Sequence, residues 1–187
     1  MLYFLIELGI VSFLNQMIVC EDINLAIINH LENKRGLRIL DIGCGSGALG
    51  EIIKNNGNYV EGVTISEQEA EIARNKLDKV FVLDVESDNY LITNEYDVIL
   101  FADILEHLRN PWVILERFNQ YLKKDGEIII SVPNVATWTT RFSLMLGAFN
   151  YSRTGLMDRS HLRFFTIKTA KELVRITGYR IKKIDIT

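Results

Sequence analysis

A glycine-rich segment, ILDIGCGSGALG at residues 39–50, has the composition of a loop that holds a small molecule. Its second half, Gly45 to Gly50, matches the G-x-G-x-x-G pattern of backbone loops that surround the pyrophosphate of a dinucleotide. Its first half places Asp41 two residues before the first glycine, where a carboxylate would repel phosphate. The segment therefore leaves two kinds of ligand open, one with phosphates and one with a positive charge.

Acidic side chains follow three of the predicted strands. Asp41 follows the first strand, Asp84 the third, and Asp103 and Glu106 the fourth. Ligands of open parallel sheets bind beyond the carboxyl ends of the strands, so we expect these acids to share one site. S-adenosylmethionine offers a sulfonium, an ammonium group, an adenine amine and ribose hydroxyls, all of which suit carboxylate acceptors. The acids therefore favour this ligand over a dinucleotide.

The hydrophobic pattern predicts the elements that must position these residues. Short runs rich in Val and Ile are typical of strands buried on both faces of a parallel sheet. Helical patterns lie between them, and Ser66 with Glu69 forms the sequence of a capping box. The alternation predicts an α/β fold with a doubly wound, mostly parallel sheet. The runs are 37–42, 58–65, 79–85, 96–102 and 126–132, and the helical patterns are 48–55, 67–77 and 111–122.

Length, composition and charge limit the class of protein. A chain of 187 residues suits one domain, and 48% hydrophobic with 24% charged residues is ordinary for a soluble globular protein. The net charge of -3 gives no broad basic surface, so we expect no nucleic-acid partner. Two cysteines are too few for a disulfide scaffold, and a reducing cytoplasm is the expected location.

The first 20 residues are mostly apolar but are interrupted by Glu7, Asn15 and Gln16. A carboxylate inside a membrane span is costly, so we expect no span here. The segment also lacks the positive start and the cleavage site of a signal peptide. We interpret residues 1–22 as a helical extension that packs on the domain or on another subunit, and residues 23–187 as a single domain.

Several motifs now point to a family. LDIGCGSG (40–47) resembles motif I of the class I S-adenosylmethionine-dependent methyltransferases, which have a Rossmann-like fold. The resemblance covers about residues 24–187, and its later part is similar to a bacterial subgroup linked to cell-surface polysaccharide or methionine-related pathways. The other segments that carry it are VFVLDVES (80–87), YDVILFADILEHLRNPW (96–112), SVPNVATW (131–138) and GLMDRSHLRFFT (155–166).

The resemblance implies S-adenosylmethionine as the cofactor, S-adenosylhomocysteine as its product, and a role for each matching residue. Asp41 would orient the methionine ammonium group, Asp84 would accept a hydrogen bond from the adenine amine, and the Val85 backbone would read the ring. No metal ligand is expected. The remaining residues of the expected cofactor site are Gly43, Cys44, Gly45, Gly47, Thr64, Ile65, Ala102 and Asp103.

Thr64 departs from the family, which usually has Asp or Glu at the end of the second strand to bind both ribose hydroxyls. A threonine hydroxyl makes a neutral hydrogen bond, worth about 1 kcal/mol, where a charge-assisted bond is worth about 1.5–3. We therefore expect cofactor affinity to be about tenfold lower, unless Glu61 or Glu67 reaches the site.

Methyl transfer from a sulfonium requires alignment of the acceptor and exclusion of water, and an oxygen acceptor also requires a base. Histidine titrates near neutrality, so His107 and His161 are the candidate catalytic residues, although either can instead be a structural imidazole. The segment at about 135–160 is the expected substrate cover. Its arginines suit an anionic substrate: Arg141, Arg153 and Arg159.

The sequence therefore predicts a methyltransferase that acts on a small-molecule or sugar-type acceptor, with transfer to oxygen. Two alternatives remain open. A non-catalytic, methyltransferase-like partner protein in a biosynthetic pathway explains Thr64. An NAD(P)-dependent oxidoreductase uses the Gly45 to Gly50 match but leaves Asp41 and Asp84 unexplained.

The class I fold normally has seven strands, the last antiparallel and inserted between the fifth and the sixth. Here the helical pattern at 167–177 is followed by the sixth predicted strand, 179–186, and the sequence ends at Thr187. We therefore expect a sheet without its seventh strand and a truncated form of a longer protein. The open edge, or the N-terminal helix, would support a homo-oligomer.

Overall fold

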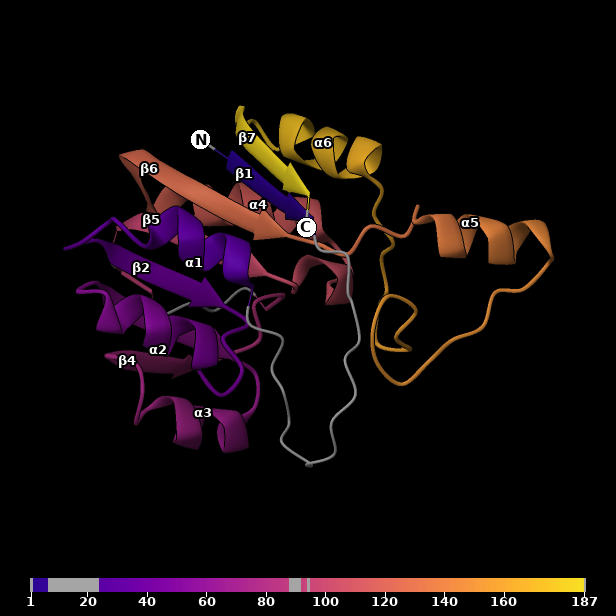
Figure 1. Cartoon of the computed structure of the whole chain (residues 1–187). Helices are drawn as coiled ribbons and strands as arrows, with labels where there is room; N and C mark the ends of the chain where they lie inside the picture. The colour runs from indigo at the N-terminus through magenta and orange to yellow at the C-terminus, as the bar shows by residue number, and fades with distance from the viewer. Residues whose placement is uncertain (1, 7–23, 88–91, 94, 187) are drawn as a thin grey trace.

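The computed structural model describes residues 2–6, 24–87, 92–93 and 95–186 (Figure 1). Its seven-stranded sheet has the order β4-β3-β2-β5-β6-β1-β7, and the neighbouring strands described pair in parallel. The predicted doubly wound α/β fold is confirmed. The strands are β1 (Leu2–Ile6), β2 (Arg38–Ile42), β3 (Tyr59–Thr64), β4 (Lys79–Val82), β5 (Tyr96–Ala102), β6 (Leu122–Ser131) and β7 (Ile181–Ile186).

Helices cover both faces of the sheet because successive strand residues enter different cores. In β5, Leu100 packs with residues of α1 and α2, whereas Ile99 packs with residues of α4 and α6. None of the described helices is long and apolar enough to cross a membrane. The helices are α1 (Leu25–Leu31), α2 (Ala48–Asn55), α3 (Glu67–Ala73), α4 (Pro111–Phe118), α5 (Trp138–Met145) and α6 (Ile167–Ile176), with short 3-10 turns η1 (Leu105–His107) and η2 (Asn119–Tyr121).

The first residues of the chain correct one prediction. A helix was expected across residues 1–22, but Leu2–Ile6 is strand β1, and residues 7–23 lie outside the described part. The segment LYFLI is rich in aromatic and branched residues, which suit a strand, and the edge of β6 offers it unpaired backbone groups.

Strand β1 lies between β6 and β7 and pairs in parallel with both. The expectation of a missing seventh strand and an open edge at β6 is therefore wrong for this sheet. The seventh strand comes from the beginning of the chain and is parallel, whereas the seventh strand of the usual family pattern is antiparallel and comes last in the chain. The β6 edge is thus not exposed for the self-association expected from the sequence.

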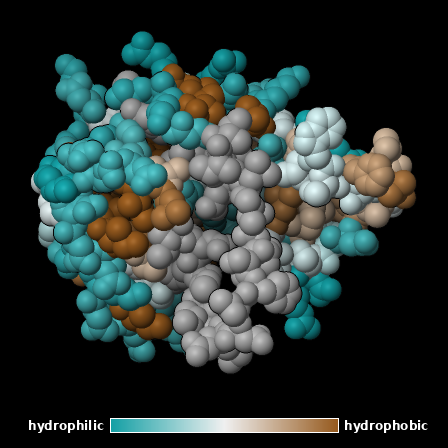
Figure 2. Space-filling view, viewed as in Figure 1, coloured by the Kyte–Doolittle hydropathy of each residue, from teal (hydrophilic) through white to brown (hydrophobic). Residues whose placement is uncertain are grey.

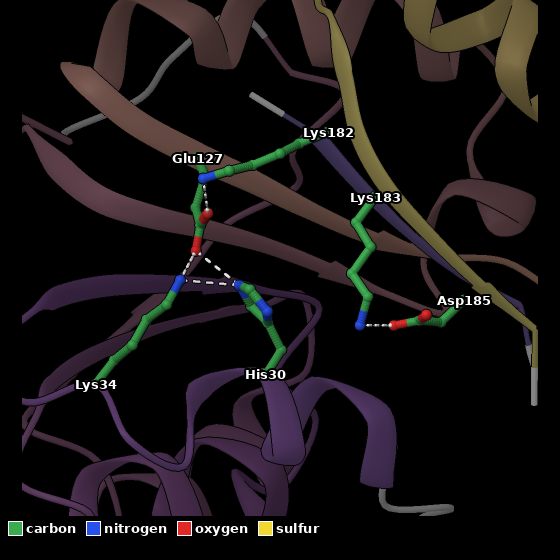
Figure 3. A network of polar contacts seen from close by, with 6 residues as sticks. All are labelled: His30, Lys34, Glu127, Lys182, Lys183 and Asp185. Carbon is green, nitrogen blue, oxygen red and sulfur yellow. Dashed lines mark hydrogen bonds and ion pairs between the residues drawn. The ribbon is translucent and has the colours of Figure 1, made fainter.

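Helix α1 is tied to the sheet by Glu127, a residue of β6 that is 7% exposed. His30 of α1 contacts Glu127 Oε1 through Nε2 at 3.0 Å, Lys34 donates to the same oxygen, and Lys182 of β7 lies 3.9 Å from Oε2 (Figure 3). Burial alone would raise the pKa of Glu127, but the bonds to His30 and Lys34 outweigh it and lower the pKa to about 2. Glu127 is therefore held ionised between three basic side chains.

The expected substrate cover extends away from the sheet. Helix α5 and the loop after it project on the right of the molecule in Figure 1, and Figure 2 shows an apolar tip there. No residue of α5 is buried, and Trp138, Phe142 and Met145 are among its exposed apolar side chains. Thr137 begins the helix by accepting a hydrogen bond from Thr140 N.

Candidate functional site

Two adjoining cavities lie at the carboxyl ends of β2, β3 and β5, where the sequence predicted a site. Their volumes are about 230 and 500 Å³. Residues that line the first include Asn24, Asp41, Cys44, Ala48 and Ala102, and residues that line the second include Thr64, Ile65, Asp84, Val85 and His107. Gly43, Gly45, Glu69 and Asp103 line both.

The glycine loop between β2 and α2 forms the wall shared by the two cavities. Gly43 and Gly45 have φ values of +78° and +52°, which side chains other than glycine rarely adopt. A Cβ on Gly43 would lie 2.9 Å from Ile104 Cδ1, and the Gly43 N–H donates to Val63 O at 2.9 Å. The hydrogen bond to β3 and the contact with Ile104 therefore hold the loop in place, and Gly43 and Gly45 line both cavities.

Gly47 has a different role from the one expected. It lines neither cavity, and it begins α2 with a φ of +81°. A Cβ there would lie 3.2 Å from both Ala73 Cβ and Leu77 Cγ. Close packing of α2 against the end of α3 and the residues that follow it therefore accounts for this glycine.

Asp41 and Asp103 bring two carboxylates to the first cavity. Asp41 is the buried penultimate residue of β2, and Asp103 follows β5 with a φ of +50°. Ser131 of β6 holds the Asp103 N–H through both its backbone oxygen, at 3.2 Å, and its hydroxyl, at 3.1 Å. A non-glycine residue in this strained conformation is typical of a functional site.

A carboxylate that the sequence analysis did not identify lies between the cavities. Thr64 Oγ1 donates a hydrogen bond to Glu69 Oε2 at 2.6 Å, and Thr64 is 4% exposed. Ser66 Oγ accepts from Glu69 N, as the predicted capping box requires, but the Glu69 side chain turns to Thr64. The acid that β3 lacks at its end is thus supplied from the first turn of α3.

The two acids considered for this role in the sequence are engaged elsewhere. Glu61 is fully buried and bonds to Arg38 and Tyr96, and Glu67 forms an ion pair with Arg74 at 2.7 Å. Neither lines the two cavities.

Asp84 stabilises a turn and also lines the second cavity. Its Oδ1 accepts a hydrogen bond from Glu86 N at 2.8 Å, and its backbone oxygen accepts one from the Ser87 hydroxyl. This turn uses one carboxylate oxygen, and Oδ2 is not part of it. Asp84 can therefore stabilise the turn and still accept a hydrogen bond from a ligand.

Glu106, His107 and His161 form a cluster at one end of the second cavity. His107 is the member of the cluster that lines this cavity. One possible ligand atom from each residue lies within 4.8 Å of the others. Leu162 and Arg163 donate their backbone N–H groups to Glu106 O at 2.8 and 2.9 Å. This pairing brings the two histidines together across 54 residues of sequence, with ring centroids 4.8 Å apart.

The carboxyl group of Glu106 is buried without a full set of partners. The residue is 1% exposed, and its Oε2 has no hydrogen-bond partner among the described residues. Burial raises the pKa of Glu106 to about 8, and the charge of Asp103 adds to this shift. Burial also lowers the pKa of His107, with a contribution from His161. The sequence indicated the two histidines separately and placed Glu106 only among the strand-end acids.

The histidine tautomers follow from their partners. His107 Nδ1 lies 3.3 Å from Ser160 O, and His161 Nδ1 lies 3.2 Å from Leu156 O. Because a carbonyl oxygen only accepts, each Nδ1 carries the proton in these contacts. The Nε2 lone pair of each neutral ring is then the one that can bind a proton or a cation.

Asn24, the N-cap of α1, lines the first cavity and was not expected there. Its Oδ1 accepts from Ala26 N and Ile27 N, which fixes the orientation of the amide. Its Nδ2 is buried and has no partner among the described residues. Neither helix α1 nor its approach to the glycine loop was predicted from the sequence.

Comparisons with known proteins agree with this geometry. A family model described as a methyltransferase domain matches residues 19–184. Ubiquinone biosynthesis O-methyltransferase from Idiomarina loihiensis is 30% identical over 122 residues, which are 60% of this chain and 49% of that protein. The chain thus spans about half the length of the curated relatives it matches.

Two solved structures have the same fold. A putative methyltransferase from Bacillus halodurans is 19% identical, with a TM-score of 0.64 over 83% of this chain and 68% of that chain. Magnesium protoporphyrin IX methyltransferase from Synechocystis, with bound S-adenosylhomocysteine, is 18% identical, with a TM-score of 0.61 over 82% and 69%.

Proposed function

The chain belongs to the methyltransferase-domain family, and we propose that it transfers a methyl group from S-adenosylmethionine to an oxygen atom of a small-molecule or sugar-type acceptor. One observation carries this proposal: Asp41, Glu69 and Asp84 surround the glycine loop from three separate elements. Three carboxylates at one loop suit a cationic ligand rich in donors and oppose a pyrophosphate. The name of the O-methyltransferase relative supports oxygen as the acceptor atom.

The lining residues fit the cofactor from end to end. Asp41 and Asp103 in the first cavity suit the methionine ammonium group, and Asp84 in the second suits the adenine amine. Glu69, which lines both, suits the ribose hydroxyls between them. Gly43 and Gly45 leave the backbone accessible along the whole length. When bound, S-adenosylmethionine supplies an electrophilic methyl group on a sulfonium.

The cluster of Glu106, His107 and His161 lies where the acceptor would approach. No metal ligand was expected from the sequence, but the meeting of these three side chains changes this expectation. We propose that the cluster holds a divalent cation with a preference for nitrogen and oxygen ligands, such as Zn²⁺ or Mn²⁺. A cation would give the buried Glu106 Oε2 the partner it lacks, and the two Nε2 lone pairs are available to it. A cation held by these three residues would act as a Lewis acid and would favour loss of the proton from an acceptor hydroxyl.

The alternatives from the sequence have less support. A dinucleotide would place its phosphates among the carboxylates of Asp41, Glu69 and Asp103. A non-catalytic partner protein was suggested by Thr64, and Glu69 now supplies the acid that appeared to be lost. We propose the cytoplasm as the location, because two cysteines are too few for a disulfide scaffold.

Methyl transfer can be tested with a panel of acceptors of different chemistry. The full chain, loaded with Zn²⁺ or Mn²⁺, is incubated with S-adenosylmethionine labelled in the methyl group and with sets of phenols, sugars and amines. The proposal expects label on the oxygen of one hydroxyl-bearing set, and loss of that label in Glu106→Gln. Label on amines alone would contradict transfer to oxygen.

A further inference from the structure

A third cavity, of about 520 Å³ and basic in its lining, lies between the end of β6, helix α5 and the first turns of α6. Three cationic side chains contribute to its wall, and no carboxylate does. The complete lining is Asn134, Ala136, Arg141, Thr166, Ile167, Lys168 and Lys171. A cavity with this lining attracts an anion.

Nothing in the described part of the chain neutralises these cations. None of Arg141, Lys168 and Lys171 forms an ion pair with a described carboxylate. The Arg141 guanidinium instead lies over the ring of Trp138, 5.3 Å from its centroid. Residues 135–171 contain six Lys and Arg and a single Asp, in a chain of net charge -3. This segment is therefore locally basic, and three of its six cations line the cavity.

Neutral donors add to the charge. Asn134 Oδ1 accepts from Ala136 N at 3.0 Å, which leaves the amide nitrogen of Asn134 as the donor for a ligand. Thr166 begins the ten-residue helix α6, and the N–H groups of Ile167 and Lys168 have no partner inside the helix. Several donors around one cavity suit the three oxygens of a phosphate better than the two of a carboxylate.

The basic cavity is joined to the proposed acceptor site through one segment. Residues 161–168 begin with His161 of the cluster and end with Lys168 of the cavity wall. Within this segment Leu162 N donates to Glu106 O, and Phe165 O accepts from Val135 N, the residue after Asn134. The proposed acceptor site and the basic cavity are thus built on the two ends of one segment.

We propose that the cavity binds a phosphate group carried by the methyl acceptor. Phosphate binding rests only on the cavity, whereas its assignment to the acceptor rests on the proposed methyltransferase function. The phosphate could belong to a soluble ester, such as a sugar phosphate, or to a lipid headgroup, and the chemistry of recognition is the same for both.

Titration calorimetry of the full chain with inorganic phosphate and pyrophosphate, at constant ionic strength in chloride, tests the binding. We expect saturable binding that weakens at least about tenfold in the double variant Lys168→Gln, Lys171→Gln. Lys124→Gln, which removes an exposed lysine of β6 outside the cavity, is the matched control and should bind as the wild type does. Equal binding by the double variant, or equal weakening by the control, would overturn the proposal.

Two further measurements identify the molecule that carries the phosphate and test the phosphate site independently of the proposed methyltransferase function. Glucose 1-phosphate and phosphatidylcholine vesicles that contain phosphatidic acid are compared as ligands. Lysine-dependent binding of either supports the cavity and identifies a soluble or a lipid source, and absence of both contradicts it. S-adenosylhomocysteine binding is measured on every variant. Phosphate binding without S-adenosylhomocysteine binding would reject the proposed function and leave the phosphate site standing.

Discussion

The Thr64 hydroxyl and the Glu69 carboxylate share a hydrogen bond of 2.6 Å between the two cavities of the candidate site. This pair explains how a strand that ends in threonine can still present an acid to a ribose. The hydroxyl donates to one carboxylate oxygen and accepts from Ser66 N at 3.2 Å, so it holds Glu69 in one orientation. The acid that the family usually has at the strand end is here supplied by Glu69 in the following helix.

Replacing Glu69→Gln should lower the affinity for S-adenosylhomocysteine by about tenfold, because a charge-assisted bond to the ribose becomes a neutral one. Glu67→Gln is the matched control, since Glu67 lies in the same helical turn but pairs with Arg74. Titration calorimetry measures both. Equal affinities in wild type and Glu69→Gln would show that another group binds the ribose.

A double-mutant cycle tests whether Thr64 and Glu69 act together in cofactor binding. Thr64→Asp alone should weaken binding or leave it unchanged, because it places a second carboxylate beside Glu69. In the Glu69→Gln background the same change should restore affinity, since one acid is again present at the strand end. Additive effects of the two substitutions would mean that Thr64 and Glu69 act independently.

Substitutions at two glycines distinguish the effect of backbone strain on stability from the effect of a filled cavity on cofactor binding. Gly45→Val should abolish cofactor binding, because Gly45 lines both cavities at a φ of +52°. Gly36→Val is the control, since Gly36 has a φ of +69° and nothing within 4 Å of its Cβ position. It should lower the free energy of unfolding by about 1–3 kcal/mol and leave S-adenosylhomocysteine affinity unchanged. Tight binding by Gly45→Val would place the ligand elsewhere.

Removal of metal should abolish methyl transfer if the cluster holds a cation. We expect dialysis against a chelator to stop transfer and Zn²⁺ or Mn²⁺ to restore it, with S-adenosylhomocysteine affinity little changed. Calorimetric titration of the dialysed chain with Zn²⁺ should show one site that is lost in His161→Asn. His30→Asn, which changes the histidine near Glu127, should retain it. Full activity after chelation would contradict the proposed metal site. His107 would then again be the candidate general base.

Glu127 predicts a dependence of stability on pH. Its folded pKa, about 2, lies below the ordinary value of 4.5, so the ionised form contributes stability above pH 4.5. This contribution is lost as the pH falls from about 4.5 to about 2. Glu127→Gln should therefore be less stable by about 2 kcal/mol in urea unfolding at pH 7, and the difference should shrink over that range. Asp125→Asn, an exposed neighbour, should show a much smaller difference.

Local patterns predicted much of the fold and of the cofactor site. The strand at 37–42, the glycine loop and Asp84 were visible because their signals lie within short segments. The partner of Thr64 was not, because it depends on the direction of the Glu69 side chain. The meeting of Glu106 with His161 depends on backbone bonds between segments more than 50 residues apart. Strand β1 depends on a free edge that only the assembled sheet provides.

The proposed function depends above all on binding of S-adenosylmethionine in the cavities around Asp41, Glu69 and Asp84. Titration calorimetry of the full chain with S-adenosylhomocysteine, and separately with NADH, tests this binding. We expect saturable binding of S-adenosylhomocysteine that weakens in Asp84→Ala, and no binding of NADH. Binding of NADH without binding of S-adenosylhomocysteine would contradict it.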